Sequence, residues 1–263
     1  MSSDRHTAAL RIARDAGTLA LDYYRRVGEL NVISKGTQDF VTEADRNVEV
    51  RVREMIAQAF PDDGIVGEEH APKQGITGYT WVIDPIDGTA NFINSIPAWT
   101  VVLAVVKEDQ TVEGVIHDPV HDETFAATRG KGATLNGAPM RCPADARFDR
   151  GSISVGYCNR AGVETTTRFL GDVMARGGVF SRSGSGALSL AYVAAGRYVG
   201  YLEEHMNAWD CLAGQLIISE AGGRVEDQSA NQMIAQGGRV IAGSAGLFDE
   251  LVMLADSVMQ DRP

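Results

Sequence analysis

The stretch Trp81-Val-Ile-Asp84-Pro85-Ile86-Asp87-Gly88-Thr89 decides how this chain folds and what chemistry it can perform. It places two carboxylates three residues apart at the end of an apolar run that predicts a buried strand. Pro85 has no N–H and interrupts the hydrogen bonding of that strand, so that Ile86 can offer its carbonyl outward. Gly88 lets a ligand approach the backbone, and the N–H groups that follow can begin a helix facing an anion. This combination favours a site for Mg²⁺ and phosphate over a structural core.

The composition limits the kinds of partner that this chain can have. It has 263 residues, of which 44% are hydrophobic and 22% are charged, as is ordinary for a globular protein. That length suffices for one large domain or two closely packed halves. The net charge of −11 argues against nucleic acid as a main partner, because binding to its backbone depends on clustered Lys and Arg. An acidic protein that acts on an anionic substrate needs cations at its site, which bound metal would supply.

The cysteines and the N-terminal segment predict a cytoplasmic location. Cys142, Cys158 and Cys211 have no zinc-finger or CxxC spacing, and an odd, sparse set indicates reduced thiols. The first 15 residues carry charges throughout and lack the apolar core of a signal peptide. The apolar runs are too short to span a membrane. We therefore expect no membrane partner.

Hydrophobic periodicity predicts two regions with different patterns of elements. In residues 1–145 we expect helices at 4–27 and 43–59, strands at 65–66, 81–83, 99–107, 112–117 and 123–128, and a tight turn at Asn136-Gly137. Residues 146–263 alternate strand and helix, which is typical of an α/β arrangement. There we expect strands at 152–155, 179–181, 197–202 and 238–242, and helices at 162–176, 185–195, 208–221 and 246–259. Because no linker separates the regions, we predict a single domain over residues 1–263.

Three further acidic positions indicate a metal site only when they are taken together, because each one alone has an ordinary structural explanation. The pair Glu68-Glu69 follows a short apolar strand, and paired glutamates are usually solvated surface. Asp210 begins a predicted helix, where an acid commonly complements the helix dipole. Asp45 has the same explanation in the helix over 43–59. Together with the two carboxylates of the opening stretch, these residues could complete an oxygen shell for a hard cation.

The order and spacing of these residues resemble the inositol monophosphatase family along nearly the entire chain. The blocks that carry the resemblance are Asp39-Phe-Val-Thr-Glu-Ala-Asp45, Gly67-Glu68-Glu69, Asp84-Pro-Ile-Asp87-Gly-Thr89, Trp209-Asp210 followed by Ala213-Gly214, and Glu220-Ala-Gly-Gly223. The resemblance implies an α/β (α+β) fold, a layered α-β-α-β-α sandwich of the inositol monophosphatase and fructose bisphosphatase type. It also implies a Mg²⁺-dependent phosphomonoesterase that Li⁺ inhibits, and a homodimer.

The resemblance implies a set of metal ligands. Glu68, Asp84 and the carbonyl of Ile86 would hold a first Mg²⁺, and Asp84, Asp87 and Asp210 would hold a second. A third, weaker ion would sit near Glu68. Phosphate-monoester hydrolysis needs large charge stabilisation, because its uncatalysed rate is extremely slow. Metal ions would supply that stabilisation and activate water, and they would offset the mutual repulsion of the crowded carboxylates.

The resemblance also implies catalytic roles for residues beside the metals. Thr89 would orient the attacking water together with Glu68, and Asp45 would orient Thr89. The N–H groups of Gly88 and Thr89 would help to hold the phosphate. No histidine base is required, because bound metal can bring the pKa of water towards neutrality.

The implied substrate contacts come from two segments of the C-terminal region, with Asp87 and Asp210 beside them. The turn Gly184-Ser185-Gly186 resembles the substrate-facing turn of the family, with Gly186 in place of the common alanine. Glu203 aligns with a carboxylate that accepts hydrogen bonds from inositol hydroxyls, with an exposed acid at a strand end as the alternative. Residues 204–208 depart from the Gly and Pro of relatives, which puts the sugar specificity in question and leaves the metal chemistry untouched.

Several substrates and one different class of function stay open. Myo-inositol 1-phosphate or a similar small polyol phosphate is favoured. Histidinol phosphate is a rival, because a cationic substrate would also suit Glu203 and Glu204. Fructose 1,6-bisphosphate and 3′-phosphoadenosine 5′-phosphate fit less well, because the chain lacks an evident insertion or basic cluster for a second phosphate. A non-catalytic interaction protein that retains the fold is the remaining alternative, and the complete ligand set argues against it.

Overall fold

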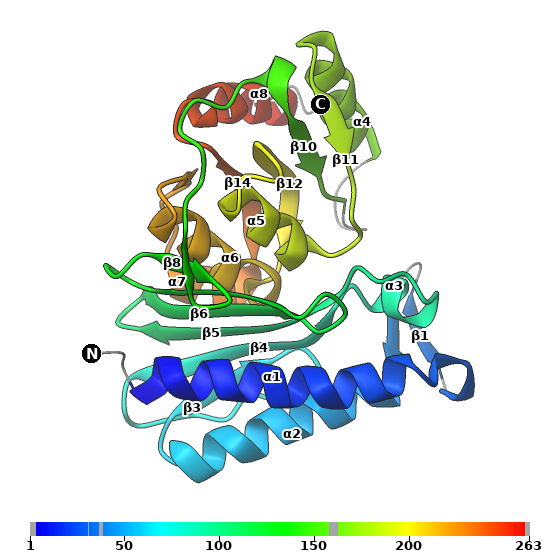
Figure 1. The fold of residues 1–263 in the computed structure, drawn as a ribbon, viewed down its shortest axis with the longest axis vertical. Coiled ribbons are helices and arrows are strands. Elements are labelled where there is room, and N and C mark those ends of the chain that lie inside the picture. Colours follow the sequence, from blue (N-terminus) through cyan, green and yellow to red (C-terminus); the bar gives the residue numbers. More distant parts are fainter. Residues whose placement is uncertain (1–3, 31, 37–38, 158–162, 261–263) are drawn as a thin grey trace.

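The computed structural model describes residues 4–30, 32–36, 39–157 and 163–260. The described residues form five layers, in the order helices, sheet, helices, sheet, helices (Figure 1). This is the layered α/β sandwich that the resemblance implies. In this part of the chain no helix is both long and apolar enough to cross a membrane.

Two long helices, α1 (Asp4–Tyr24) and α2 (Glu43–Ala59), form the first layer. The buried face of α1 is mostly alanine, so the helix lies close to the sheet. Close approach explains Gly17, since a Cβ there would lie 2.4 Å from the ring of His117. The bounds of α2 match the prediction. Helix α1 ends three residues before the predicted end, and the chain continues into a 3-10 turn, η1 (Val27–Glu29).

The first sheet has seven strands and carries the opening stretch on its second strand. Its strands follow chain order: β3 (Gly64–Gly67), β4 (Tyr79–Asp87), β5 (Thr100–Lys107), β6 (Gln110–Asp118), β7 (Glu123–Thr128), β8 (Ala133–Leu135) and β9 (Ala138–Met140). Strands β3 and β4 are parallel, and the other neighbours are antiparallel. Asn136 and Gly137, with φ of 50° and 80°, form the predicted tight turn between β8 and β9.

The middle layer lies between the two sheets and holds α5 (Gly186–Ala194), α6 (Ala208–Glu220) and α7 (Ala230–Gln236). Helix α6 is buried on nearly all sides, so it has almost no amphipathic pattern. It packs so closely on β6 that a Cβ on Gly114 would lie 2.8 Å from the carbonyl oxygen of Ala213. The short helix α3 (Thr89–Ile93) lies at one end of the first sheet, next to the hairpin of β1 (Val32–Gly36) and β2 (Asp39–Thr42).

The second sheet has five strands, in the order β11 (Val179–Ser181), β10 (Ser152–Val155), β12 (Gly200–Met206), β14 (Gly238–Gly243) and β13 (Arg224–Val225). Helices α4 (Val163–Ala175) and α8 (Phe248–Gln260) cover its outer face. A 3-10 turn, η2 (Phe148–Arg150), precedes β10.

The predicted strand at 197–202 is wrong in its position. The N–H groups of Arg197 and Tyr198 bond to the carbonyl of Tyr192 at the end of α5, so these residues belong to the helix turn. The strand therefore starts at Gly200, and Glu203 lies in its interior. Helix α7, strand β13 and the β1–β2 pair are further elements that the periodicity did not resolve. Cys158 and residue 162 lie outside the described residues, while Cys142 and Cys211 are buried free thiols.

Candidate active site

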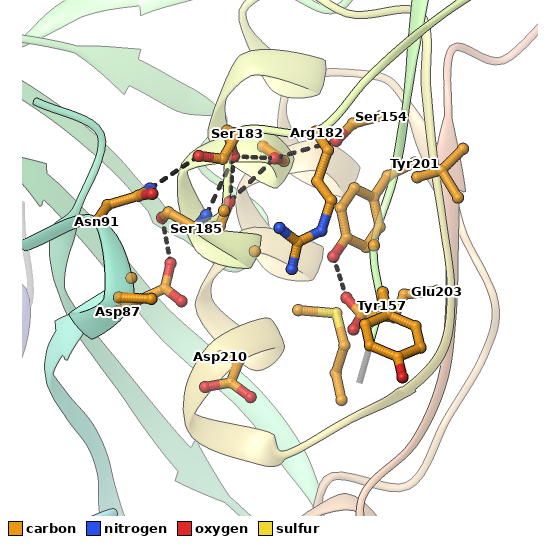
Figure 2. Close-up of a pocket in the computed structure, with 18 of the residues that line it drawn as sticks. Asp87, Asn91, Ser154, Tyr157, Arg182, Ser183, Ser185, Tyr201, Glu203 and Asp210 are labelled. Atoms are coloured by element: carbon orange, nitrogen blue, oxygen red, sulfur yellow. Dashed lines mark hydrogen bonds between the residues drawn. The ribbon is translucent and has the colours of Figure 1, made fainter. Parts of the chain in front are cut away.

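The opening stretch ends at a cavity of about 600 Å³ that residues from both halves of the chain line. Figure 2 shows Asp87 on one side of this cavity, Asp210 below it, and Tyr201 with Glu203 on the other side. Nine predicted site residues line it: Glu68, Asp87, Gly88, Thr89, Gly184, Ser185, Gly186, Glu203 and Asp210. Three others, Asp45, Asp84 and Ile86, are buried behind the lining residues.

Three carboxylates converge at this cavity. Asp84, Asp87 and Asp210 each place an oxygen within 4.8 Å of the others, although Asp210 comes from α6 in the other half of the chain. Burial, with the negative charge of Glu68 and the other two acids, raises the pKa of Asp84 well above its usual value. Burial and the charge of Asp87 raise the pKa of Asp210 to about 7. A buried set of carboxylate oxygens is unfavourable alone and fits a hard divalent cation such as Mg²⁺.

An irregularity in β4 brings two of these acids to one side of the strand. Side chains alternate across a strand, so residues three apart normally face opposite ways. Here Asp84 pairs with Val102 and Asp87 with Thr100, so three steps on β4 oppose two on β5. This register shift between Asp84 and Asp87 adds a residue to β4, so that both carboxylates reach the cluster with Asp210. Asp84 is fixed further by the N–H of Ile86, 2.9 Å from its Oδ1.

Asp87 is bound to the N-terminus of α5. Its Oδ2 accepts hydrogen bonds from the Ser185 hydroxyl and, at 2.9 Å, from the N–H of Ala187. Burial raises the pKa of Asp87, and the hydrogen bonds from these donors offset part of that rise. The predicted turn at 184–186 thus positions Asp87, one of the expected metal ligands, in addition to lining the cavity.

Asp45 and Asp210 each have a structural role and a site role at once. The N–H of Thr42 donates to Asp45 Oδ2 at 2.8 Å, and the N–H of Asn207 donates to Asp210 Oδ2 at 3.1 Å. Both acids therefore cap the first turn of a helix, which is the structural role that the sequence suggested for each of them. One oxygen of each remains: Asp45 Oδ1 accepts from the Thr89 hydroxyl at 3.1 Å, and Asp210 joins the carboxylate cluster.

Thr89 is held by the backbone turn that begins α3. Gly88 precedes it with φ of 97°, a conformation that favours glycine. The Thr89 hydroxyl lies 3.1 Å from both Asp45 Oδ1 and the carbonyl oxygen of Ile86. A hydroxyl has one proton and can donate to only one of them at a time. If the Ile86 carbonyl binds another partner, the Thr89 hydroxyl can still donate its hydrogen bond to Asp45.

Glu49 is a buried acid that the sequence reasoning missed. Its Oε2 accepts the N–H of Glu69 at 2.7 Å, and its Oε1 accepts from Arg53 at 2.6 Å. Arg53 also donates to the carbonyl of His70 at 3.1 Å, so the pair holds the segment that carries Glu68. A signal was available, because Glu49 falls in line with the buried positions of α2. An acid in an apolar stripe normally has a buried partner.

The far side of the cavity contains Glu203, with a hydrogen bond from the Tyr201 hydroxyl. Glu203 is buried, and burial is the main cause that raises its pKa to about 8. The alternative of an exposed acid at a strand end is therefore wrong. At Gly186 a Cβ would lie 2.6 Å from Cε of Met206, the end of a flexible side chain that can shift, so nothing in the structure explains the glycine in place of alanine. Sequence reasoning did not single out Tyr157, Arg182 or Met206, which also line the cavity.

Comparisons with known proteins agree with this fold and with the family resemblance. A sequence model described as the inositol monophosphatase family matches residues 2–260. The chain is 37% identical to Nus factor SuhB of Escherichia coli K12 over 239 residues, 90% of each protein. The crystal structure of the extragenic suppressor protein SuhB from Bartonella henselae superposes with a TM-score of 0.90 and 34% identity over 99% of this chain and 100% of that one. An IMPase from Thermotoga maritima gives a TM-score of 0.88 with 32% identity, over 98% and 99% of the two chains.

Proposed function

This chain belongs to the inositol monophosphatase family, and we propose that it is a Mg²⁺-dependent phosphomonoesterase that acts on a small polyol phosphate. Myo-inositol 1-phosphate is the preferred substrate. The observation that carries the proposal is the convergence of Asp84, Asp87 and Asp210 within 4.8 Å beside the cavity. Those three residues come from two distant parts of the sequence, and a purely structural role would not require them to meet with no ion pair to a described Lys or Arg.

The residues that would hold two to three Mg²⁺ ions are Glu68, Asp84, Asp87, Asp210 and, through its carbonyl, Ile86. When bound, the metal supplies positive charge for the phosphate and lowers the pKa of water. The carboxylates themselves are fixed in advance by bonds to backbone N–H groups, at Ile86, Ala187 and Asn207. Such preorganisation lowers the entropy lost when the ligands and the substrate come together.

We assign the orientation of the attacking water to Thr89 and Glu68. When the Thr89 hydroxyl donates to Asp45, a lone pair of its oxygen is available to accept a hydrogen bond from water. Glu68, which lines the same cavity, would accept the second hydrogen bond of that water. The N–H groups of Gly88 and Thr89 would donate to phosphate oxygens, as the first N–H groups of a helix can.

The leaving group would lie against the turn at 184–186 and Glu203, with Asp87 and Asp210 at the boundary with the phosphate. Glu203 accepts hydrogen bonds from substrate hydroxyls in this assignment. Histidinol phosphate is the alternative substrate within the same reaction class. A cytoplasmic homodimer, sensitive to Li⁺ and with no nucleic-acid or membrane partner, completes the proposal. The family membership and the net charge of −11 support it.

A phosphate-release assay tests the reaction class and the substrate together. Purified protein is given inositol, histidinol, fructose and nucleotide phosphates, with and without Mg²⁺ and Li⁺. We expect release from inositol 1-phosphate that requires Mg²⁺ and falls when Li⁺ is added. Release that continues after chelation of divalent metals would contradict the assignment of the carboxylate cluster.

A second candidate function is binding to a macromolecular partner. It is favoured by the names of the curated relatives, which are called Nus factors. If the protein releases no phosphate from any compound of the panel in Mg²⁺, this function replaces the enzymatic one. If it does release phosphate, a variant without turnover, Asp84→Asn, can show whether a binding role persists separately.

A further inference from the structure

Arg182 lies in the loop between β11 and α5, directly before the turn that holds Asp87. Figure 2 shows its guanidinium extending into the cavity, between the side that carries Asp87 and the side that carries Tyr201 and Glu203. Among the described residues that line the cavity, Arg182 is the only Lys or Arg. The cavity otherwise carries acids, so this one fixed positive charge distinguishes the leaving-group side from the metal side.

The guanidinium of Arg182 is not committed to a structural partner within the described chain. Other arginines form ion pairs there, such as Arg53 with Glu49 and Arg197 with Glu123. For Arg182 no hydrogen bond or ion pair is formed with a described residue. Its charge does act on Glu203: burial raises the pKa of that acid most strongly, and Arg182 opposes the rise. Its donors are therefore directed at a region that a ligand can occupy.

Arg182 and Glu203 offer opposite hydrogen-bonding functions to the same space. A guanidinium only donates, and an ionised carboxylate only accepts. A hydroxyl group can satisfy both, because it donates one hydrogen bond and accepts others. An ammonium group can satisfy only Glu203, and its charge is repelled by Arg182 in a cavity of lower dielectric than water.

We propose that Arg182 determines leaving-group specificity, by donating to hydroxyl oxygens of a polyol phosphate and by disfavouring an ammonium-bearing substrate. The proposal rests on the proposed phosphatase function and narrows its substrate class. It distinguishes inositol 1-phosphate from histidinol phosphate, which Glu203 and Glu204 alone do not do. Selection of this kind acts by repulsion as well as by attraction.

The test compares inositol 1-phosphate with histidinol phosphate as substrates of the full-length protein in Mg²⁺. Arg182→Gln removes the charge and keeps a side chain that can donate, while Arg182→Glu reverses the charge. Arg147→Gln is the matched control, because Arg147 forms an exposed ion pair with Asp149. We expect Arg182→Gln to raise KM for inositol 1-phosphate roughly ten- to hundredfold, the size of a lost charged hydrogen bond, with a smaller change in kcat. KM for histidinol phosphate should stay constant or fall, and fall further in Arg182→Glu.

The outcomes separate this proposal from the one on which it rests. If KM rises equally for both compounds, Arg182 attracts the phosphate that they share, and the specificity role is wrong. The role is also wrong if neither KM changes. If the wild-type protein hydrolyses neither compound, the substrate assignment fails, and the phosphatase proposal fails with it when no compound of the wider panel is hydrolysed. Calorimetric binding of the same two compounds then still decides the role of Arg182, because only the affinity for inositol 1-phosphate should fall in Arg182→Gln.

Discussion

The Thr89 hydroxyl lies 3.1 Å from Asp45 Oδ1, across 44 residues of sequence. The other oxygen of Asp45 is held by the N–H of Thr42 at 2.8 Å and by its hydroxyl at 2.6 Å. The carboxylate therefore cannot rotate freely, and the first turn of α2 holds one of the two acceptors of the Thr89 hydroxyl in place. A helix cap and the proposed catalytic hydroxyl thus share a single side chain.

We expect Asp45→Asn to lower kcat by about a hundredfold or more, because an amide can turn an NH₂ group towards Thr89 and disturb the orientation of the water. The apparent affinity for Mg²⁺ should change little, since Asp45 is not a proposed ligand. Steady-state phosphate release at several Mg²⁺ concentrations measures both quantities. A kcat close to that of wild type would show that Thr89 does not depend on Asp45.

Asp84→Asn should abolish turnover and most of the thermal stabilisation by Mg²⁺. Asp84 is fully buried at the centre of the cluster, and its proposed role bridges both ions. Thermal unfolding with and without Mg²⁺ gives a readout that does not depend on activity. Asp149→Asn, at an exposed site, serves as the control. Near-normal turnover in Asp84→Asn would show that Asp84 is not a shared ligand of both ions.

The metal-free protein should become less stable as pH rises from about 5 to 8.5. The folded-state pKa values of Asp84, Asp87, Asp210 and Glu203 are raised, so the folded protein binds more protons than the unfolded chain in this range. The stability that protonation gives is complete below the usual carboxyl pKa. It is lost as pH passes the folded-state values, about 7 for Asp210 and about 8 for Glu203.

Thermal melts over that pH range, in the presence of a chelator, measure this effect. Mg²⁺ should reduce the decline, because it binds the ionised carboxylates that form at higher pH. Asp210→Asn should make the metal-free curve flatter, since it removes one of the titrating groups. A Tm that rises with pH in the absence of metal would contradict the assignment.

Glu49→Ala should weaken Mg²⁺ binding by roughly ten- to a hundredfold, the usual effect of removing a residue that positions a metal ligand. The loss would act through the 67–70 segment, since Glu49 holds the N–H of Glu69. Glu49→Gln keeps an acceptor for that N–H and should recover part of the affinity. Calorimetric titration with Mg²⁺ measures this affinity. Glu54→Gln, at an exposed position on the same helix, is the control. Unchanged affinity in Glu49→Ala would leave Glu49 with a packing role only.

The sequence was sufficient for features that local chemistry determines. Thr42 as cap and Pro61 as stop set the bounds of α2, and the positive φ angles of Asn136-Gly137 set the β8–β9 turn. The family membership was also predictable, because the blocks around Asp84 and Asp210 have specific spacing. The assigned roles of the site residues and the single domain over 1–263 stay predictions.

What could not be predicted depends on contacts between distant segments. The start of β12 depends on how the N–H groups of Arg197 and Tyr198 cap α5. The contact between Gly186 and the Met206 side chain also joins segments that are distant in the sequence. Arg182 carries no motif, so the sequence gave no reason to choose it over the other arginines. Glu49 could have been found only from its place in the apolar stripe of α2.

The bond between Asp87 and the N-terminus of α5 has a consequence for inhibition. Asp87 ends a strand of the first sheet, while α5 belongs to the helix layer between the two sheets, so the proposed metal site joins two layers of the molecule. A compound that displaces α5 by a fraction of an ångström relative to β4 would move the carboxylate of Asp87 without entering the cavity. An inhibitor of that kind would not need the negative charge of phosphate mimics, which hinders their entry into cells.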